Sequence, residues 1–194
     1  KAAALERVQS DETGTHVKLG AGRKATLTLD GKLQAHVAGI FERYEVPFAS
    51  LVAIEPSTGR VLAYVSHASA NPSAGDLARD PTPPAASVFK IVTTTALLEA
   101  GVPRNEKVCF HGGLSRLEAD DLVDDPKRDK SCATLEEALA MSTNAVFAKL
   151  AVRHLNPAVL TKTAKRFGFG RKVPFDFPWR PSGIALPGEK LEFA

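Results

Sequence analysis

The tetrapeptide Ser87-Val88-Phe89-Lys90 constrains this chain most, because it places a hydroxyl and an amine one helical turn apart at the start of an apolar run. Pro83 and Pro84 would stop any earlier helix, and helix-forming residues then run from Ile91 to Ala100. Gly101 follows as a C-terminal stop. We therefore expect Ser87 near a helix N-terminus, where free backbone N–H groups and the helix dipole favour a developing negative charge.

The pair of Ser87 and Lys90 suggests a nucleophile and its general base for an acylation reaction. A serine hydroxyl is a weak nucleophile unless a nearby base takes its proton, and a lysine can act as that base when burial lowers its pKa. The pattern alone is not specific, since a chain with this serine and lysine content has roughly 0.7 such matches by chance. The position of this pattern at the start of a predicted helix makes it more specific.

Composition predicts one globular domain with a real core, because 44% of the 194 residues are hydrophobic. The 25 basic and 22 acidic residues are scattered, which argues against a nucleic-acid surface. No apolar run approaches the ~18 residues of a membrane span, and the N-terminus lacks a signal-peptide pattern. The start at Lys1 and the polar segment from Gln9 to Lys24 suggest a piece of a longer protein with residues 1–24 as a polar lead-in.

The cysteines leave two interpretations open. Cys109 and Cys132 flank a polar loop and could form a disulfide in a secreted context or remain two buried thiols. Neither has the Cys/His spacing of a zinc site, and the acidic run 118–125 lacks the glycine and closing glutamate of a calcium loop. We expect no metal and no cofactor, and none of the five histidines is assigned to catalysis.

Periodicity predicts a mixed α/β (α+β) chain with paired antiparallel strands first and helices later. The stretch 102–131 should be mostly irregular and the tail 173–188 a wrapping loop. The expected elements are a strand at 25–30, a helix at 33–44, strands at 49–55 and 60–66 joined by a turn, and helices at 87–100, 134–141, 144–154 and 157–167.

A second group of polar side chains lies at Ser142-Thr143-Asn144, between two predicted helices. Placed opposite Ser87 and Lys90, Ser142 could relay a proton and Asn144 could hold a substrate amide. Ser69-Ala70-Asn71 has the same spacing, but it falls in a loop before the nucleophile. The alternative for Ser142 is a simple helix cap.

Further short motifs occur along the chain in a fixed order. They are Leu27-Thr28-Leu29-Asp30 with Leu33-Gln34 after it, Val52-Ala53-Ile54-Glu55-Pro56, Thr58-Gly59-Arg60-Val61-Leu62-Ala63, Pro84 to Lys90, Leu135 to Leu139, Ser142-Thr143-Asn144-Ala145, Arg166 to Gly170 and Ser182-Gly183-Ile184. In this order they resemble the transpeptidase domain of high-molecular-weight penicillin-binding proteins, over most of residues 25–194.

The resemblance implies a penicillin-binding, serine β-lactamase-like fold, with an antiparallel sheet flanked by helices and an all-α lobe. It implies that Ser87 is the acylated nucleophile, Lys90 its base, Ser142 the proton relay and Asn144 the substrate-orienting amide. Thr143 stands where a Ser-Asp-Asn motif has aspartate. The implied substrate is the D-Ala-D-Ala end of a peptidoglycan stem peptide, with β-lactam antibiotics as inhibitors, on the extracytoplasmic or periplasmic side of the cell envelope.

One departure from the family is a missing third motif, because no Lys-Thr-Gly or Lys-Ser-Gly follows Ser142. Lys162-Thr163-Ala164 lies in a predicted helix and has alanine where the family's strand needs glycine. We therefore expect residues 25–194 to be the N-terminal and helical portion of the domain, without its C-terminal strands. On that reading the chain alone is inactive and needs a separate C-terminal segment, and a membrane anchor could precede Lys1.

Three alternatives remain at this stage. A non-turnover β-lactam sensor or penicillin-binding scaffold would keep the acylated serine. A β-lactamase would need a residue that activates the deacylating water, and no glutamate stands in a convincing place. A non-catalytic interaction domain would use Ser87 as a helix cap and Lys90 as a solvated residue.

Overall fold

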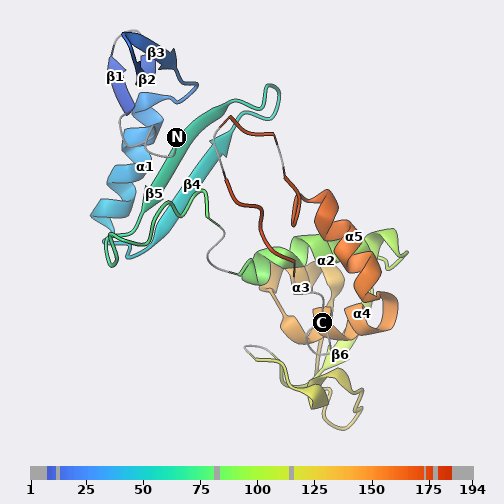
Figure 1. The fold of residues 1–194 in the computed structure, drawn as a ribbon. Coiled ribbons are helices and arrows are strands. Elements are labelled where there is room, and N and C mark those ends of the chain that lie inside the picture. The colour runs from blue at the N-terminus through green and yellow to red at the C-terminus, as the bar shows by residue number, and fades with distance from the viewer. Residues whose placement is uncertain are drawn as a thin grey trace. The chain divides into compact units, whose positions relative to one another are not determined.

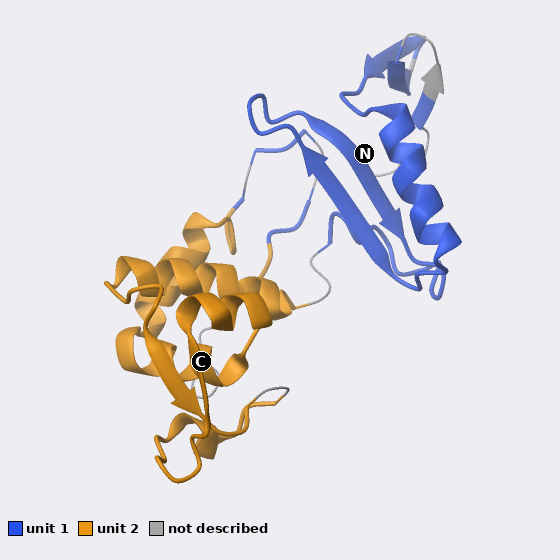
Figure 2. Ribbon diagram, turned by 180° about the vertical axis from the view of Figure 1, so that it is seen from behind, with its two compact units in different colours: residues 1–82, 172–181 blue, residues 83–171, 182–194 orange. Residues whose placement is uncertain are grey.

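The structure is a computed structural model that describes residues 8–11, 14–80, 84–113, 116–172, 174–176 and 179–184. The chain forms two compact units (Figure 2). Unit 1 comprises residues 1–82 and 172–181, and unit 2 comprises residues 83–171 and 182–194. Antiparallel sheets and helices are both present, as the sequence predicted, and Figure 1 shows their order along the chain.

Unit 1 holds two antiparallel sheets and one helix. The three-stranded sheet has the order β1-β2-β3, and the two-stranded sheet pairs β4 with β5. The elements are β1 (Val8–Asp11), β2 (Gly14–Gly20), β3 (Arg23–Thr26), α1 (Gly31–Arg43), β4 (Ala49–Ile54) and β5 (Val61–His67).

The polar lead-in is more structured than its composition indicates, because β1, β2 and the start of β3 lie in it. The strand expected at 25–30 is wrong in its bounds: β3 starts at Arg23 and stops at Thr26. Asp30 caps α1 instead, and its carboxylate accepts the backbone N–H groups of Lys32 and Leu33. A short acidic side chain can accept hydrogen bonds from the unpaired N–H groups of a helix start. Asp30 is therefore more stable as the N-cap of α1 than as a strand residue.

The predicted hairpin is confirmed, since β4 and β5 pair antiparallel with Leu51 opposite Val65. Helix α1 lies along β5, as Figure 1 shows. The amide of Gln34 fixes it there, because Nε2 donates to the carbonyl of Tyr64 at 2.6 Å and Oε1 accepts the Tyr64 N–H at 2.8 Å. The helix therefore covers a ribbon that would be marginal by itself in water.

Unit 2 is built around α4 (Asn144–His154), whose residues 145–151 are all buried. Phe147 and Leu150 belong to the largest buried side chains of the core. The other elements are a 3-10 turn (Ala86–Phe89), α2 (Lys90–Glu99), β6 (Lys107–Phe110), a second 3-10 turn (Ala119–Leu122), β7 (Ser131–Thr134), α3 (Leu135–Met141) and α5 (Pro157–Arg166). The four helices were all predicted, with bounds that shift by a few residues at most.

The described part of 102–131 is mostly irregular, as expected, but the sequence did not indicate that β6 and β7 form an antiparallel pair. Each strand has only four residues, too few for their alternation to stand out in the sequence. Cys109 and Cys132 lie directly opposite each other in this pair and form a disulfide. The interpretation as two free thiols is therefore wrong.

The tail has no helix or strand at 174–176 and 179–184, and the rest of the predicted loop lies outside the described residues. Within the described part of the chain, no helix has the length and apolar character needed to span a membrane. Lys162-Thr163-Ala164 lies in α5, with Thr163 and Ala164 buried.

Candidate active site

Ser87 lies in the 3-10 turn that leads into α2, and α2 itself begins at Lys90. The backbone N–H of Lys90 donates to the carbonyls of Ser87 and Val88, which ties the serine to the start of the helix. Ala86, just before the serine, has a φ of 47°, a left-handed conformation that is uncommon for a residue with a side chain. The expected position of Ser87 at a helix N-terminus is confirmed.

Ser142 and Asn144 stand on either side of the short connection from α3 to α4. Ser142 ends α3 in the left-handed conformation, with φ 56° and ψ 39°. Thr143 is the N-cap residue of α4, and Asn144 is the first residue of that helix. Because the connection is so short, both side chains are fixed by the packing of the two helices.

The ammonium nitrogen of Lys90 brings these groups together. Lys90 Nζ donates to Ser87 Oγ at 2.9 Å, to Ser142 Oγ at 3.0 Å and to Asn144 Oδ1 at 2.5 Å. A lysine ammonium has three N–H donors, so each finds one acceptor. All four side chains singled out in the sequence thus converge on one point of unit 2.

Two features of the surroundings act on the charge of Lys90 in opposite directions. Partial burial lowers its pKa, because removal from water disfavours the charged form. The ring of Phe147 lies 5.8 Å from Nζ and favours the cation through its negative face. Burial is the cause that lowers the pKa of Lys90, so more of the amine is neutral than in an ordinary lysine.

The geometry suits proton transfer. At 2.9 Å, a neutral Lys90 can accept the proton of Ser87 while its oxygen attacks an acyl carbon. The hydroxyl of Ser142 lies 3.0 Å from Lys90 Nζ, so the amine can pass the proton on to it.

The other residues considered in the sequence, Ser69, Asn71 and His111, form hydrogen bonds elsewhere in the structure. Ser69 Oγ donates to the carbonyl of Val46, and Asn71 Oδ1 accepts the N–H of Ser73 in its own turn. His111 pairs with Asp129. The described residues contain no group of three or more His, Cys, Asp or Glu side chains placed to hold a metal ion.

Sequence reasoning missed Lys149, whose side chain is fully buried in α4. The available sign was its position inside the apolar run 145–151, where a lysine requires an internal partner.

Comparison with known proteins is consistent with this geometry. A family model, the penicillin binding protein transpeptidase domain, matches residues 49–194. The peptidoglycan D,D-transpeptidase PbpA of Mycobacterium tuberculosis is 30% identical over 167 residues, which cover 71% of this chain and 32% of PbpA. The chain thus spans about a third of the length of that curated relative.

Solved structures share the fold. Penicillin-binding protein A of M. tuberculosis, solved as a ceftriaxone acyl-enzyme complex, aligns with a TM-score of 0.67 at 24% identity, over 87% of this chain and 44% of that one. The penicillin-binding protein PonA1 of M. tuberculosis aligns with a TM-score of 0.57 at 25% identity, over 75% of this chain and 38% of that one. This chain therefore belongs to the family of penicillin-binding protein transpeptidase domains.

Proposed function

We propose that this chain carries the nucleophile, the base and the proton relay of a peptidoglycan D,D-transpeptidase. The observation that supports this most is the contact of Lys90 Nζ with Ser87 Oγ, Ser142 Oγ and Asn144 Oδ1. Membership of the transpeptidase family is the second support. On this proposal the substrate is the peptidoglycan of the cell envelope.

In the proposed acylation, Ser87 Oγ attacks the carbonyl carbon between the two D-Ala residues of a stem peptide and transfers its proton to Lys90. The tetrahedral intermediate collapses when the terminal D-Ala leaves as an amine, which receives a proton by way of Ser142. An ester between Ser87 and the shortened peptide remains. The amine of a neighbouring stem then attacks that ester, which forms the cross-link and returns the proton to Ser87.

A β-lactam would follow the same first step. Ser87 opens the lactam ring, but the amine that forms stays tethered to the acyl group, so it does not diffuse away. The site then remains esterified. The acyl-enzyme of penicillin-binding protein A with ceftriaxone is a complex of that kind in a protein with this fold.

Acylation also needs two donors for the oxyanion. The Ser87 N–H can supply one, and we propose that a Lys-Thr-Gly or Lys-Ser-Gly strand, a motif not found after Ser142 in this chain, supplies the other. Removal of one such donor typically costs about 10² to 10³ in rate. On this proposal these 194 residues are inactive by themselves and need a separate C-terminal segment. The native protein works at the extracytoplasmic or periplasmic face of the inner membrane.

The intact mass of the native protein after exposure to penicillin tests the proposal. We expect one penicillin added per molecule, with loss of the adduct in Ser87→Ala and retention in the matched control Ser69→Ala. Release of D-Ala from a model peptide then separates a transpeptidase from a sensor. An adduct that survives in Ser87→Ala contradicts the assignment of the nucleophile. Stoichiometric labelling of the 194 residues alone contradicts the need for another strand.

A further inference from the structure

Lys149 is a buried cation on the same helix as Asn144, and the proposed mechanism does not use it. Its side chain is 0% exposed. Nζ lies 3.0 Å from Asp129 Oδ2, 3.2 Å from Asp124 Oδ1 and 3.1 Å from the carbonyl oxygen of Cys109. A charge buried this deeply persists only with such partners, so these contacts hold Cys109, Asp124 and Asp129 against α4.

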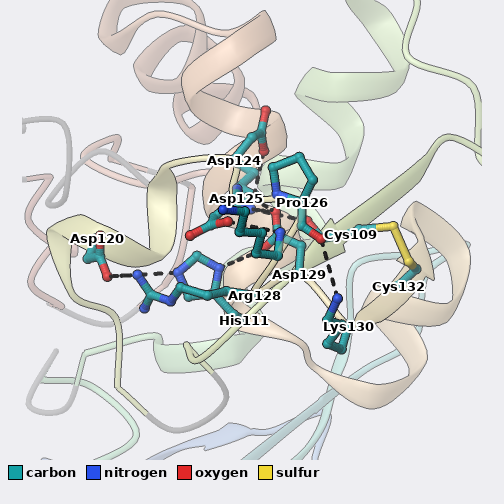
Figure 3. Close-up of polar contacts among 12 residues, drawn as sticks. Cys109, His111, Asp120, Asp124, Asp125, Pro126, Arg128, Asp129, Lys130 and Cys132 are labelled. Atoms are coloured by element: carbon teal, nitrogen blue, oxygen red, sulfur yellow. Dashed lines mark hydrogen bonds and ion pairs between the residues drawn. A yellow bond between two sulfur atoms is a disulfide. The ribbon is translucent and has the colours of Figure 1, made fainter.

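Asp129 links Lys149 to two further residues, Asp125 and His111. Its Oδ2 accepts from Lys149 and from the backbone N–H of Asp125. Its Oδ1 bonds His111 Nδ1, and Figure 3 shows His111 and Asp129 facing each other. Burial works against ionisation of Asp129, but the hydrogen bonds from His111, Lys149 and Asp125 outweigh it and hold its pKa well below the ordinary value. The carboxylate is therefore charged at neutral pH, and it fixes His111 directly after β6.

Two glycines continue from His111 toward the site. Both have φ 61°, the left-handed region that favours glycine. A Cβ on Gly112 would fall on the carboxylate of Asp121, and a Cβ on Gly113 would lie 2.8 Å from the Cβ of Ala145. The chain thus passes α4 more closely than any other residue type allows.

The carbonyl of Gly113 then takes the place of a helix cap. Helix α4 has no side-chain capping bond from Thr143, so its first N–H groups need another acceptor. The N–H of Ala145 donates to the Gly113 carbonyl at 3.1 Å. Ala145 directly follows Asn144, whose side chain bonds Lys90.

We propose that Lys149 is a positioning residue: through Asp129, His111 and Gly113 it fixes the start of α4, and with it the placement of Asn144 and Ser142 around Lys90. This inference rests on the proposed acylation. Lys149 touches none of the reacting atoms. Its effect is on the fraction of molecules in which the side chains of Lys90, Ser142 and Asn144 are aligned for reaction.

The test measures penicillin acylation of the native protein and separates the dissociation constant of the first complex from the acylation rate constant. In Lys149→Met we expect the rate constant to fall by about 10- to 100-fold, because small misplacements of catalytic groups have effects of this size. The dissociation constant should stay nearly unchanged. Gly113→Ala should show the same pattern without any change of charge.

The double variant Lys149→Met with Gly113→Ala distinguishes positioning from general destabilisation. If both residues act along one path, the double variant is no slower than the slower single variant. A purely structural role would lower the melting temperature and the fraction labelled at saturation, but not the rate constant of the folded molecules. Controls are Lys162→Met, at an exposed lysine of α5, and Gly101→Ala, at a left-handed glycine with open space around it.

A wild-type rate constant in folded Lys149→Met overturns the positioning role and leaves the proposed function intact. If Lys149→Met does not fold, His111→Gln replaces it, since that variant keeps the pair of Lys149 and Asp129. A wild-type rate constant there overturns the role equally. Absence of labelling in the unaltered native protein overturns both proposals.

Discussion

At the scale of single residues, Ser142 combines a strained backbone with a proposed role in proton transfer. A residue with a side chain at φ 56° is held in a conformation that costs roughly 1–2 kcal/mol. Its hydroxyl lies 3.0 Å from Lys90 Nζ. Strain kept at such a position is consistent with a functional requirement for the side chain.

We expect Ser142→Gly to unfold at higher urea than Ser142→Ala, with a free energy of unfolding larger by about 1 kcal/mol. Glycine adopts the left-handed conformation without strain, whereas alanine keeps it, and both lose the hydroxyl. Both should therefore acylate more slowly than the parent protein. Equal stability of the two variants would show that the backbone conformation carries no cost.

The depressed pKa of Lys90 predicts the pH dependence of acylation. The amine acts as a base only when neutral, and burial favours the neutral form, so the rate should rise with pH with a midpoint below the ordinary lysine pKa of about 10.4. Stopped-flow acylation of the native protein between about pH 5 and 10 gives this profile. A midpoint at or above the ordinary value would argue against Lys90 as the base.

At the scale of elements, the start of α3 is a capping box. Thr134 Oγ1 accepts the N–H of Glu137 at 3.1 Å, and Glu137 Oε2 accepts the N–H of Thr134 at 2.8 Å. These bonds satisfy donors that a helix start leaves open. They also fix where the seven-residue α3 begins, and Ser142 is the C-cap residue directly after its last residue, Met141.

Thr134→Ala should lower the free energy of unfolding by about 1 kcal/mol, the usual cost of a lost N-cap. The matched control is Thr95→Ala inside α2, where the threonine hydroxyl bonds the carbonyl of Ile91 four residues earlier. Removal of that bond should be nearly neutral or slightly stabilising. Urea unfolding followed by circular dichroism measures both, and equal losses would refute the capping role.

At the scale of the whole molecule, the two units differ in how much apolar surface they bury. The main core cluster, which includes Leu97, Phe147 and Leu150, lies in unit 2. The buried apolar residues of unit 1 are few, with Val17, Val37, Ala63 and Val65 among those described. Since apolar burial is the main stabilising contribution, unit 1 should be the less stable.

Urea should therefore unfold the molecule in two steps. Trp179, the only tryptophan of the sequence, belongs to unit 1, whereas four of the five described α-helices belong to unit 2. We expect the fluorescence midpoint to fall at lower urea than the midpoint of helical circular dichroism. Coincident midpoints would show that the two units unfold as one.

The sequence by itself determined the features that depend on residues close together in the chain. Helical periodicity and caps located α1 to α5, alternation and a turn located β4 and β5, and the spacing of Ser87 and Lys90 put both on one helical turn. The family followed from the order of its motifs. These features could be predicted because their energies arise within a few residues of chain.

Only the tertiary structure decided the contacts between distant groups. Lys90 and Ser142 are 52 residues apart, and the resemblance to the family assigned them to one site without giving their contact. Lys149 and Asp129 are 20 residues apart, and no local pattern marks that pair. The disulfide between Cys109 and Cys132 likewise depended on the pairing of β6 with β7. Contacts of this kind arise when a buried charge or a short strand must find a partner, and packing of the whole unit determines which partner is within reach.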